Sequence, residues 1–457
     1  MKNVRSTLLA GGVAALLLAV TGCGSSGTTT ASTVDFGGKA TGTLAAWGFD
    51  NTDEVGTSRL DYAKDQLSSS GVKITIDATP FDAQKFTTLA ASKRTPDVVQ
   101  MDRQFVTTYA AKGLIMPLST CFSANNVDPA TQYYTSVMAD VTYNGDVWAV
   151  PQFYQPPAIM LNTRVMKEAG VTAADLDTSK PDQLIAAAKK MTTFDGKNPT
   201  RLGFDAQPTS QAGLWMLGFG GSIIGSDGKP TLDDPNNVTA VTFLKKLEDA
   251  QGGYAAVKSL ADSFDFFGDK NQFVSDQVGA EIVAQWYVNV LSPYATKVQI
   301  SGTPFLNSTG EPFTVASGTA FVIPTASKNP VAACKWALDL TSAAAWDAAG
   351  EARAATIAST DGAINTGLFT GSPAADTSLR TKYVPSTGNT GFDEAIAAYY
   401  DVVGSGQSFG SSPGGQQIQT ELQNAVSAAL LGEKSPEDAL KDGQAAALRA
   451  YTQAGGK

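Results

Sequence analysis

Aromatic rings and hydrogen-bonding side chains occur together where several predicted strands end. Trp47 stands three residues before Asp50, and Trp286 closely follows an apolar run. An aromatic ring packs against the C–H face of a ligand, while carboxylates, amides and guanidinium groups hydrogen-bond its hydroxyl groups. These residue types therefore predict a binding site for a small polar molecule. The candidates are Trp47, Asp50, Asp102, Gln152, Tyr154, Trp215, Trp286, Tyr287 and Arg353.

Each candidate also has a purely structural interpretation. A tryptophan often packs in a core, and for Trp47 both interpretations remain open. Trp286 is favoured for the site because it belongs to an aromatic pair that comes directly after a strand, at the sheet edge. Asp50 and Asp102 could instead cap helices, and Asp102 could pair with Arg103.

The chain has 457 residues and no histidine, which removes Ser-His-Asp triads, Cys-His dyads and histidine-rich metal sites. Its 33 Lys and Arg against 43 Asp and Glu give a net charge of −10. Such an acidic chain is a poor candidate for nucleic-acid binding, which needs clustered basic residues. The acids in 262–269 lack the spacing of a calcium loop. We expect no cofactor and no metal.

Strands and helices alternate in the first part of the sequence. This order predicts a mostly parallel sheet with helices on both faces, in which ligands bind beyond the carboxyl ends of the strands. Trp47, Asp50 and Asp102 lie at such ends. Strands are expected at 42–47, 72–76 and 96–102, and helices at 57–69, 83–92 and 104–112.

The amino terminus indicates an extracytoplasmic location. A short basic start precedes the apolar stretch 7–20, which is too short to span a bilayer comfortably. Val20-Thr21-Gly22-Cys23 then resembles a bacterial lipobox. We expect a signal peptide at 1–22, lipid on Cys23, a flexible polar tether at 23–33 and anchoring to the bacterial cell membrane. The two other cysteines, Cys121 and Cys334, could form a disulfide or remain separate thiols.

Seven short motifs follow one another along the chain. They are Thr41-Gly42-Thr43-Leu44 with Trp47-Gly48, Leu89-Ala90-Ala91-Ser92 with Pro96-Asp97-Val98-Val99, Ala110-Ala111-Lys112-Gly113, Asn144-Gly145 before Trp148-Ala149-Val150-Pro151, Leu161-Asn162 before Ala169-Gly170, Gly220-Gly221 before Asp227-Gly228, and Ile323-Pro324 before Ser327-Lys328-Asn329. Their order resembles family 1 of the extracellular solute-binding proteins, the lipid-anchored receptors of carbohydrate-uptake ABC transporters. The family's usual Tyr before Asn162 is replaced here by Leu161.

The resemblance implies an α/β fold like that of periplasmic binding proteins, with two discontinuous lobes and a ligand cleft between them. The lobes are expected at 34–142 plus 298–342 and at 143–297 plus 343–457. The resemblance also implies a monomer without enzymatic activity that binds a sugar and delivers it to the permease subunits of an ABC transporter.

Two other functions remain open. A lipid-anchored glycoside hydrolase would need two carboxylates roughly 5–9.5 Å apart, for which Asp50 and Asp102 could serve in principle. A receptor for a glycerophosphodiester or a peptide would favour a pair of basic side chains in the cleft, for which only Arg103 and Arg353 suggest themselves.

Overall fold

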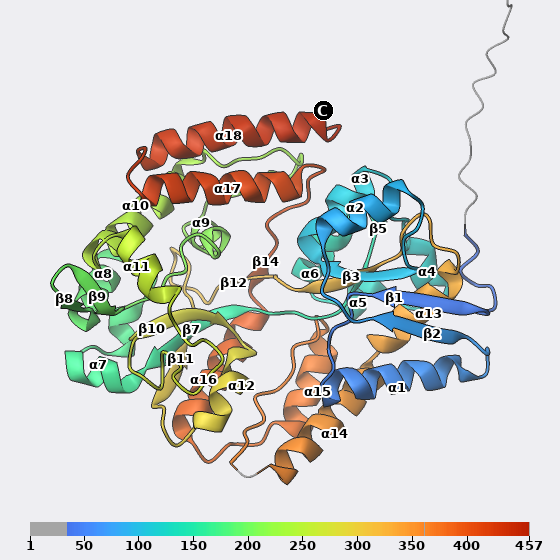
Figure 1. Cartoon of the computed structure of the whole chain (residues 1–457), viewed down its shortest axis with the longest axis horizontal. Helices are drawn as coiled ribbons and strands as arrows, with labels where there is room; N and C mark the ends of the chain where they lie inside the picture. The colour runs from blue at the N-terminus through green and yellow to red at the C-terminus, as the bar shows by residue number, and fades with distance from the viewer. Residues whose placement is uncertain (1–33, 361, 457) are drawn as a thin grey trace, which may run out of the picture. The chain divides into compact units, whose positions relative to one another are not determined.

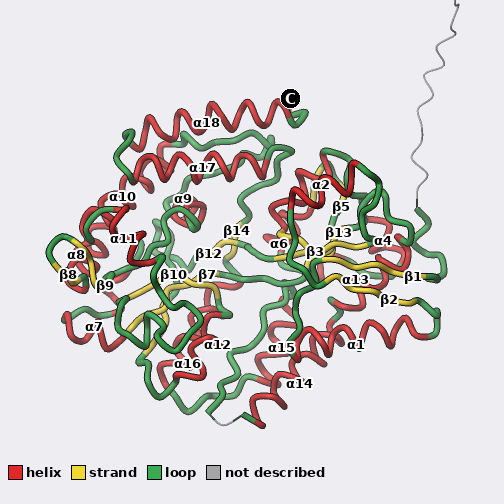
Figure 2. The backbone as a smooth tube through the Cα atoms, viewed as in Figure 1, coloured by secondary structure: helices red, strands yellow, loops and turns green. Residues whose placement is uncertain are grey.

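The computed structural model describes residues 34–360 and 362–456. The expected signal peptide, the tether and the lipidation site Cys23 lie outside the described residues. From Asp35 onward the chain builds two lobes, each around its own sheet (Figure 1). The strands of both sheets lie in the interior and the helices lie outside them (Figure 2). This is the two-lobed α/β arrangement expected from the sequence.

The sheet of the first lobe has the strand order β2-β1-β3-β13-β6. β1 pairs in parallel with both β2 and β3, so the carboxyl ends of these three strands meet at one edge. β13 runs antiparallel to β3 and β6. The strands are β1 (Thr43–Trp47), β2 (Lys73–Asp77), β3 (Val98–Asp102), β6 (Val150–Pro151) and β13 (Thr319–Val322).

Helices cover both faces of this sheet because its strands are apolar on both sides. Val99, Met101 and Val322 pack under Phe86 and Tyr109 on one face. On the other face α1 packs against α13 and α14. The helices of this lobe are α1 (Glu54–Ser68), α2 (Ala83–Ala91), α3 (Val106–Ala111), α4 (Ser119–Ala124), α5 (Pro129–Gln132), α6 (Thr135–Val141), α13 (Pro330–Leu340), α14 (Ala343–Ser359) and α15 (Pro373–Tyr383), with the 3₁₀ turn Arg103–Phe105 before α3.

The sheet of the second lobe is antiparallel, with the order β10-β7-β11. α16 covers one face. A core that contains Ile159, Leu161, Ile282, Leu244 and Val426 fills the other. The elements are β7 (Pro157–Asn162), α7 (Thr163–Ala169), 3₁₀ turn Ala173–Leu176, α8 (Pro181–Met191), α9 (Ala212–Gly218), α10 (Pro235–Ala250), α11 (Tyr254–Ala261), β10 (Ala280–Ala284), α12 (Tyr287–Leu291), 3₁₀ turn Ser292–Tyr294, β11 (Ile300–Thr303), α16 (Thr390–Val403), α17 (Gly415–Leu430) and α18 (Pro436–Gln453).

Three two-stranded sheets lie apart from the two larger sheets in the described part of the chain, and one of them lies where the lobes join. β12 (Thr314–Val315) and β14 (Gly406–Gln407) pair in parallel. The other two pieces are the hairpins β4 (Thr142–Tyr143) with β5 (Asp146–Val147) and β8 (Thr193–Asp195) with β9 (Asn198–Arg201). Among the described residues no helix combines the length and the apolar character needed to span a membrane.

The chain passes between the two sheets at 152–156 and at 304–318, and again between α15 and α16. Two segments therefore differ from the expected lobe boundaries. The expected first-lobe segment 298–342 begins with β11, but β11 pairs with β7 of the second lobe. The expected second-lobe segment 343–457 begins with α14, but α14 packs on α1 and α15 packs on α14 (Figure 1). The sequence offered no signal for either exchange.

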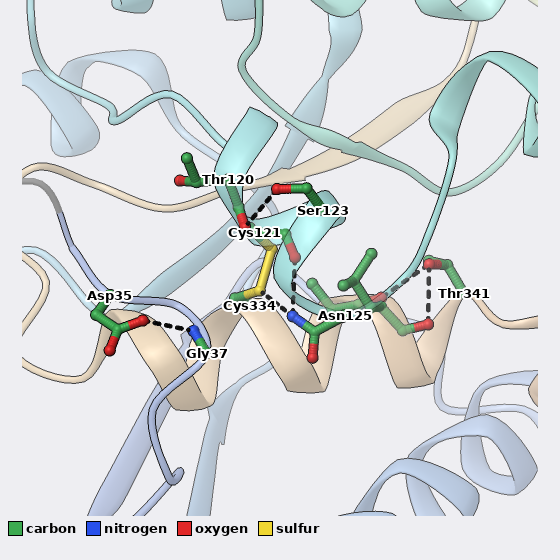
Figure 3. The surroundings of a disulfide bond; sticks show 10 residues. Asp35, Gly37, Thr120, Cys121, Ser123, Asn125, Cys334 and Thr341 are labelled. Carbon is green, nitrogen blue, oxygen red and sulfur yellow. Dashed lines mark hydrogen bonds between the residues drawn. A yellow bond between two sulfur atoms is a disulfide. The ribbon is translucent and has the colours of Figure 1, made fainter.

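Cys121 and Cys334 form a disulfide between α4 and α13, which settles the pairing that the sequence left open (Figure 3). The bridge joins residues 213 positions apart, both within the first lobe. Asn125 sits beside it and donates a hydrogen bond from Nδ2 to the Cys334 Sγ at 3.3 Å. The cross-link thus ties the middle of the first lobe to the segment that returns to it late in the chain.

Candidate functional site

A cavity of about 690 Å³ lies at the edge where the carboxyl ends of the first-lobe strands face the end of β10. This volume is within the range of small-molecule sites. The first lobe lines it with Gly48, Asp50, Asn51, Asp53, Val55, Pro80, Phe81, Asp82, Ala83, Gln100, Met101, Asp102, Phe105, Thr319 and Arg353. The crossing segment adds Phe153, Tyr154 and Gln155, the second lobe adds Gln285, Trp286 and Asn289, and the loop before α15 adds Gly367, Leu368 and Phe369.

Carboxylates of the first-lobe wall come from the loops that follow the parallel strands. Asp53 caps α1 by accepting a hydrogen bond from the Gly56 amide at 2.9 Å. Asp82 caps α2 in the same way. Such caps satisfy amides that a helix start leaves unpaired, so they fix where each loop ends. Asp50 and Asp102 also face the cavity. Asp102 stands at the start of the 3₁₀ turn Arg103–Phe105, but its side chain accepts no capping hydrogen bond.

Phe81 and Phe105 form the aromatic part of the first-lobe wall. Their ring centroids lie 5.4 Å apart. Phe81 in turn packs on Trp47 at 5.4 Å. Trp47 is 1 % exposed and donates from its indole nitrogen to the Thr79 hydroxyl at 3.1 Å. The two phenylalanines therefore present an apolar surface, and Trp47 supports it from inside the core.

A glycine allows the β1 loop to pass close to β3 beneath the cavity. Gly48 has φ +89°, and a Cβ there would lie 2.7 Å from the backbone oxygen of Gln100. The Gln100 side chain accepts a hydrogen bond from Gln152 Nε2 at 2.6 Å. Gln152 is completely buried. It therefore orients Gln100, which lines the cavity, and does not line the cavity itself.

The second-lobe wall contains no charged side chain. Trp286 is half-buried, and its ring stacks with Phe267 at 6.1 Å with an interplanar angle of 14°. Phe266 supports both rings and packs on Tyr287 at 4.3 Å. Tyr287 is buried, with its hydroxyl accepting from Gln272 Nε2 at 2.7 Å. This stack holds an indole ring at the cavity opposite the carboxylates.

The charge of the lining is strongly negative. Four carboxylates face one guanidinium, that of Arg353, and Arg353 already forms ion pairs with Asp53 and Glu54. Removal of water by the surrounding protein raises the pKa of Asp102, and the charge of Arg103 opposes this shift. Among the described residues no three acidic or cysteine side chains come close enough to bind a metal ion.

Arg103 forms no ion pair with Asp102, because its buried guanidinium has other partners. It forms an ion pair with Asp140 at 3.2 Å. It also donates to the backbone oxygens of Phe153 at 2.6 Å and Ala316 at 2.7 Å. Arg103 therefore joins both segments that cross between the lobes, and it is not available to a ligand in the large cavity.

A second cavity of about 310 Å³ continues the cleft past Asp102 and Gln155, which line both cavities. Its other walls come from the start of α9 and from α17. Polar side chains such as Gln104, Ser210 and Gln419 line it. The cleft is thus longer than the large cavity alone.

The structure brings five of the nine sequence-predicted site residues to the cavity: Asp50, Asp102, Tyr154, Trp286 and Arg353. The other four, Trp47, Gln152, Trp215 and Tyr287, are buried and do not line the cavity. Trp215 lies in the second-lobe core, where its indole nitrogen donates to the Ala206 oxygen at 3.0 Å. Tyr154 is buried beneath the cavity floor, and burial raises its pKa.

Sequence reasoning missed several residues that line the cavity. Phe81 and Asp82 stand four and five residues after β2, nearly as close as Asp50, which stands three residues after β1. The strand-end rule applied to β2 could therefore have found them. Gln285 stands beside Trp286 and could have been found in the same way. Phe369 carried no signal, because nothing in its sequence surroundings relates it to a strand end.

The sequence profile of the bacterial extracellular solute-binding proteins matches residues 50–347. This match covers more than half of the chain, which therefore belongs to that family. The observed pair of lobes with a cavity between strand ends is the architecture expected for it. The family and the two curated relatives described next are binding proteins, not enzymes.

Two curated relatives are named for the saccharides they bind. The diacetylchitobiose binding protein of Streptomyces coelicolor is 23 % identical over 53 % of this chain, and the match spans only 56 % of that protein. A maltooligosaccharide ABC transporter solute-binding lipoprotein of Streptococcus pneumoniae is 23 % identical over 73 % of this chain and 76 % of its own length.

A solved structure with the same fold is an ABC substrate-binding protein from Listeria monocytogenes in complex with cycloalternan. It has a TM-score of 0.70 at 17 % identity, and the match covers 91 % of this chain and all of that one.

Proposed function

We propose that this chain is the substrate-binding receptor of an ABC importer and that it holds a sugar or oligosaccharide in the cleft between its lobes. The observation that carries the proposal is the cavity of about 690 Å³ with Trp286 on one wall and carboxylates on the other. A saccharide offers both surfaces that these walls match, a C–H face for the ring and hydroxyl donors for the acceptors.

Membership of a binding-protein family favours a receptor over a glycoside hydrolase. Both curated relatives are named for saccharides, which favours a saccharide here also. A strongly anionic ligand is disfavoured because Arg103 and Arg353, the two basic residues that the sequence offered, are already engaged by protein carboxylates.

The receptor would act as a monomer and would not catalyse a reaction. Ligand binding would shift the lobes toward the closed arrangement that the ligand prefers, and the permease subunits of the importer would recognise it. Lipidation of Cys23 would anchor the protein outside the cytoplasm, with 23–33 as a tether. The name of the pneumococcal relative, a lipoprotein, supports this placement.

The proposal is tested with purified protein that starts after the expected signal peptide. Thermal shift and calorimetry against mono- and oligosaccharides should find a saturable ligand, and product analysis should find the saccharide intact. Hydrolysis of a bound oligosaccharide would contradict the receptor assignment. Failure of every saccharide, with stabilisation by another class of solute, would contradict the ligand assignment.

The first variant to test is Trp286→Ala. Loss of the stacked indole should weaken saccharide binding by roughly 1 kcal/mol or more, about a fivefold to tenfold rise in Kd. Phe194→Ala is the matched control, because Phe194 is a half-exposed aromatic residue in the distant β8–β9 hairpin. Calorimetry on both variants gives the comparison, and equal affinities would remove Trp286 from the site.

A further inference from the structure

A buried stretch of chain without helix or strand forms part of the cavity wall. Residues 364–372, between α14 and α15, are all buried, and three of them, Gly367, Leu368 and Phe369, line the large cavity. Buried backbone groups that belong to no helix or sheet must find other hydrogen-bond partners. The shape of this buried loop 364–372 therefore depends on the particular groups that surround it.

The buried loop 364–372 has partners in both lobes. Near its beginning the Thr366 hydroxyl donates to the Asn289 Oδ1 of α12, in the second lobe, at 2.5 Å. Near its end the Gly371 oxygen accepts from the amide of Tyr134, which stands directly before α6 of the first lobe, at 2.9 Å. A change in the hold on this loop would therefore reach both sides of the cleft.

Asp376, in the first turn of α15, holds the end of the loop. Its Oδ1 atom accepts hydrogen bonds from the Thr370 amide at 2.7 Å and from the Thr370 hydroxyl at 2.8 Å. Its Oδ2 atom accepts from the Tyr134 hydroxyl at 3.1 Å. Asp376 is 2 % exposed, and none of the ion pairs in the described part of the chain involves it. Three donors thus converge on a buried carboxylate that has no counter-charge.

Thr370 directly follows Phe369, so the Asp376 hydrogen bonds fix the backbone next to the cavity wall. The Phe369 oxygen accepts from the amide of Tyr154, another lining residue, at 3.2 Å. The Phe369 ring packs on Tyr400 of α16 with 4.6 Å between centroids. Asp376 itself does not line the cavity, and it therefore acts on the wall through Thr370.

The neutral groups around Asp376 are tyrosines from three other parts of the chain. Tyr134 precedes α6, Tyr154 belongs to a segment that crosses between the lobes, and Tyr400 belongs to α16. Burial raises the pKa of all three hydroxyl groups, so they stay neutral throughout the physiological pH range. The chain contains no histidine that could titrate there instead.

The charged groups nearest to Asp376 have other partners. Arg380, one turn further along α15, places its guanidinium 3.9 Å from the centroid of the Tyr400 ring. Arg103 and Asp140, which interact with Tyr154 from its other neighbours, form an ion pair with each other. Asp376 is therefore the group of this cluster whose charge can change near neutral pH.

The ionised and the protonated form of Asp376 differ in how well they hold Thr370. Burial raises the pKa of Asp376 to about 7, although the hydrogen bonds from Thr370 and Tyr134 favour the ionised form. Hydrogen bonds to a charged acceptor are about twice as strong as those to a neutral one. Protonation removes the charge and adds a fourth donor among the three already present, so the hold on Thr370 weakens.

We propose that Asp376 is a positioning residue for saccharide binding, whose ionised carboxylate holds the buried loop 364–372 against the cavity and whose protonation releases it. The proposal rests on the proposed function and adds a regulation of the same site by pH. A saccharide that packs on Leu368 and Phe369 favours the held loop, and the held loop favours the ionised carboxylate. Binding near neutral pH should therefore release a proton, and affinity should fall as the pH falls.

Calorimetry with maltotriose, mannobiose and diacetylchitobiose as probes tests the proposal. The dissociation constant of a bound probe should rise about fivefold or more from about pH 8.5 to about pH 5.5. Near neutral pH the heat of binding should depend on the ionisation enthalpy of the buffer, which measures the released proton. A dissociation constant independent of pH, or binding without proton release, would overturn the proposal.

The Asp376→Asn variant removes the charge and nearly keeps the shape. It should bind the probe at every pH as weakly as the wild type does at the acidic end, without proton release. Asp339→Asn is the matched control, because Asp339 is half-buried on α13 outside the cavity lining and burial raises its pKa to about 6. It should keep the wild-type pH profile. A pH dependence that survives in Asp376→Asn would belong to another carboxylate, such as Asp102, and would overturn the proposal.

A milder variant, Tyr134→Phe, serves if Asp376→Asn does not fold. It removes one donor to Asp376 and keeps the ring that packs on Tyr154 with 5.4 Å between centroids. Loss of a donor to the charged form raises the pKa of Asp376 further. The pH at which affinity falls should therefore move upward, and an unchanged pH profile would overturn the proposal.

Hydrogen exchange of the ligand-free protein tests the loop itself. After correction for the intrinsic pH dependence of exchange, the amides of the buried loop 364–372 should exchange faster at acidic than at alkaline pH in the wild type. In Asp376→Asn they should exchange equally fast at both. Equal exchange in the wild type would overturn the proposal and leave the saccharide receptor intact. Failure of the three probes and of the wider saccharide screen would overturn the proposal together with the proposed function.

Discussion

The two walls of the cleft differ in chemistry and in how they are built. The first-lobe wall offers carboxylates from loops after parallel strands, and two of those carboxylates also cap helices. The second-lobe wall offers Trp286 and uncharged amides, from the short turn that follows an antiparallel strand. The first wall can therefore select a ligand by its charge and donors, and the second by its shape and apolar face.

The walls also depend on different supports. In the first lobe a disulfide joins α4 to α13. The second lobe has no cysteine among its described residues, and an apolar core supports it instead. Variants that weaken one support should therefore separate the contributions of the two lobes to stability and to binding.

The largest effect should come from Trp215→Ala. Trp215 is fully buried in the second-lobe core, with its ring 4.9 Å from Phe305 and 5.1 Å from Phe243. Loss of such a side chain should cost about 3–5 kcal/mol of unfolding free energy. Chemical denaturation measures it. Trp286→Ala should cost much less stability, because that ring is half-exposed, and equal losses would show that Trp286 is a core residue.

Removal of the disulfide should have the next largest effect, on the first lobe. The variant Cys121→Ser/Cys334→Ser should lose about 2–4 kcal/mol, because the bridge closes a long loop in the unfolded chain. Thermal unfolding with and without reductant measures it. Reductant should lower the midpoint of the wild-type protein and leave that of the variant unchanged. A variant as stable as the oxidised wild type would contradict this prediction.

A smaller effect on stability should depend on pH and should come from β10, the strand that precedes Trp286. Glu281 in β10 is buried, and burial together with the charge of Asp205 raises its pKa. Above the ordinary pKa of about 4.5, the folded protein then keeps a proton that the unfolded chain loses. The Glu281 contribution to stability should therefore fall as pH rises from about 4.5 through the raised pKa.

The Glu281→Gln variant removes this titration. Its unfolding midpoint should exceed that of the wild type by a few degrees at pH 8, and the difference should shrink toward pH 5. Glu433→Gln is the control, because Glu433 is exposed in the loop between α17 and α18. A constant difference at all pH values would mean that Glu281 is ionised in the folded protein.

The fold could be predicted largely because strand and helix patterns are local. The site could be predicted only in part, as Trp47 and Trp286 illustrate. Trp47 is the last residue of β1, so its side chain still points to a face of the sheet that helices cover. Trp286 stands two residues beyond β10, where side chains leave the sheet and reach the cleft. Counting residues from the strand end was too coarse to distinguish the two.

Long-range pairing explains most of what the sequence could not reveal. Gln152 follows a strand, yet its side-chain amide donates a hydrogen bond to the side chain of Gln100, which lies 52 positions earlier. β11 and α14 joined the opposite lobes from those expected, because lobe membership depends on which sheet a segment meets after a crossing. No local pattern encodes that choice.

Arg103 has a mechanical consequence for how the lobes can move. Its guanidinium holds the Phe153 and Ala316 oxygens of the two crossing segments together. Between them Gly318 leaves no room for a side chain, because a Cβ would lie 2.0 Å from the Phe153 oxygen and 2.6 Å from Arg103. Separating the two segments would break these hydrogen bonds and leave a charged guanidinium buried without its partners, which is costly. Arg103 therefore fixes the two segments to each other at the place where the chain passes from one lobe to the other.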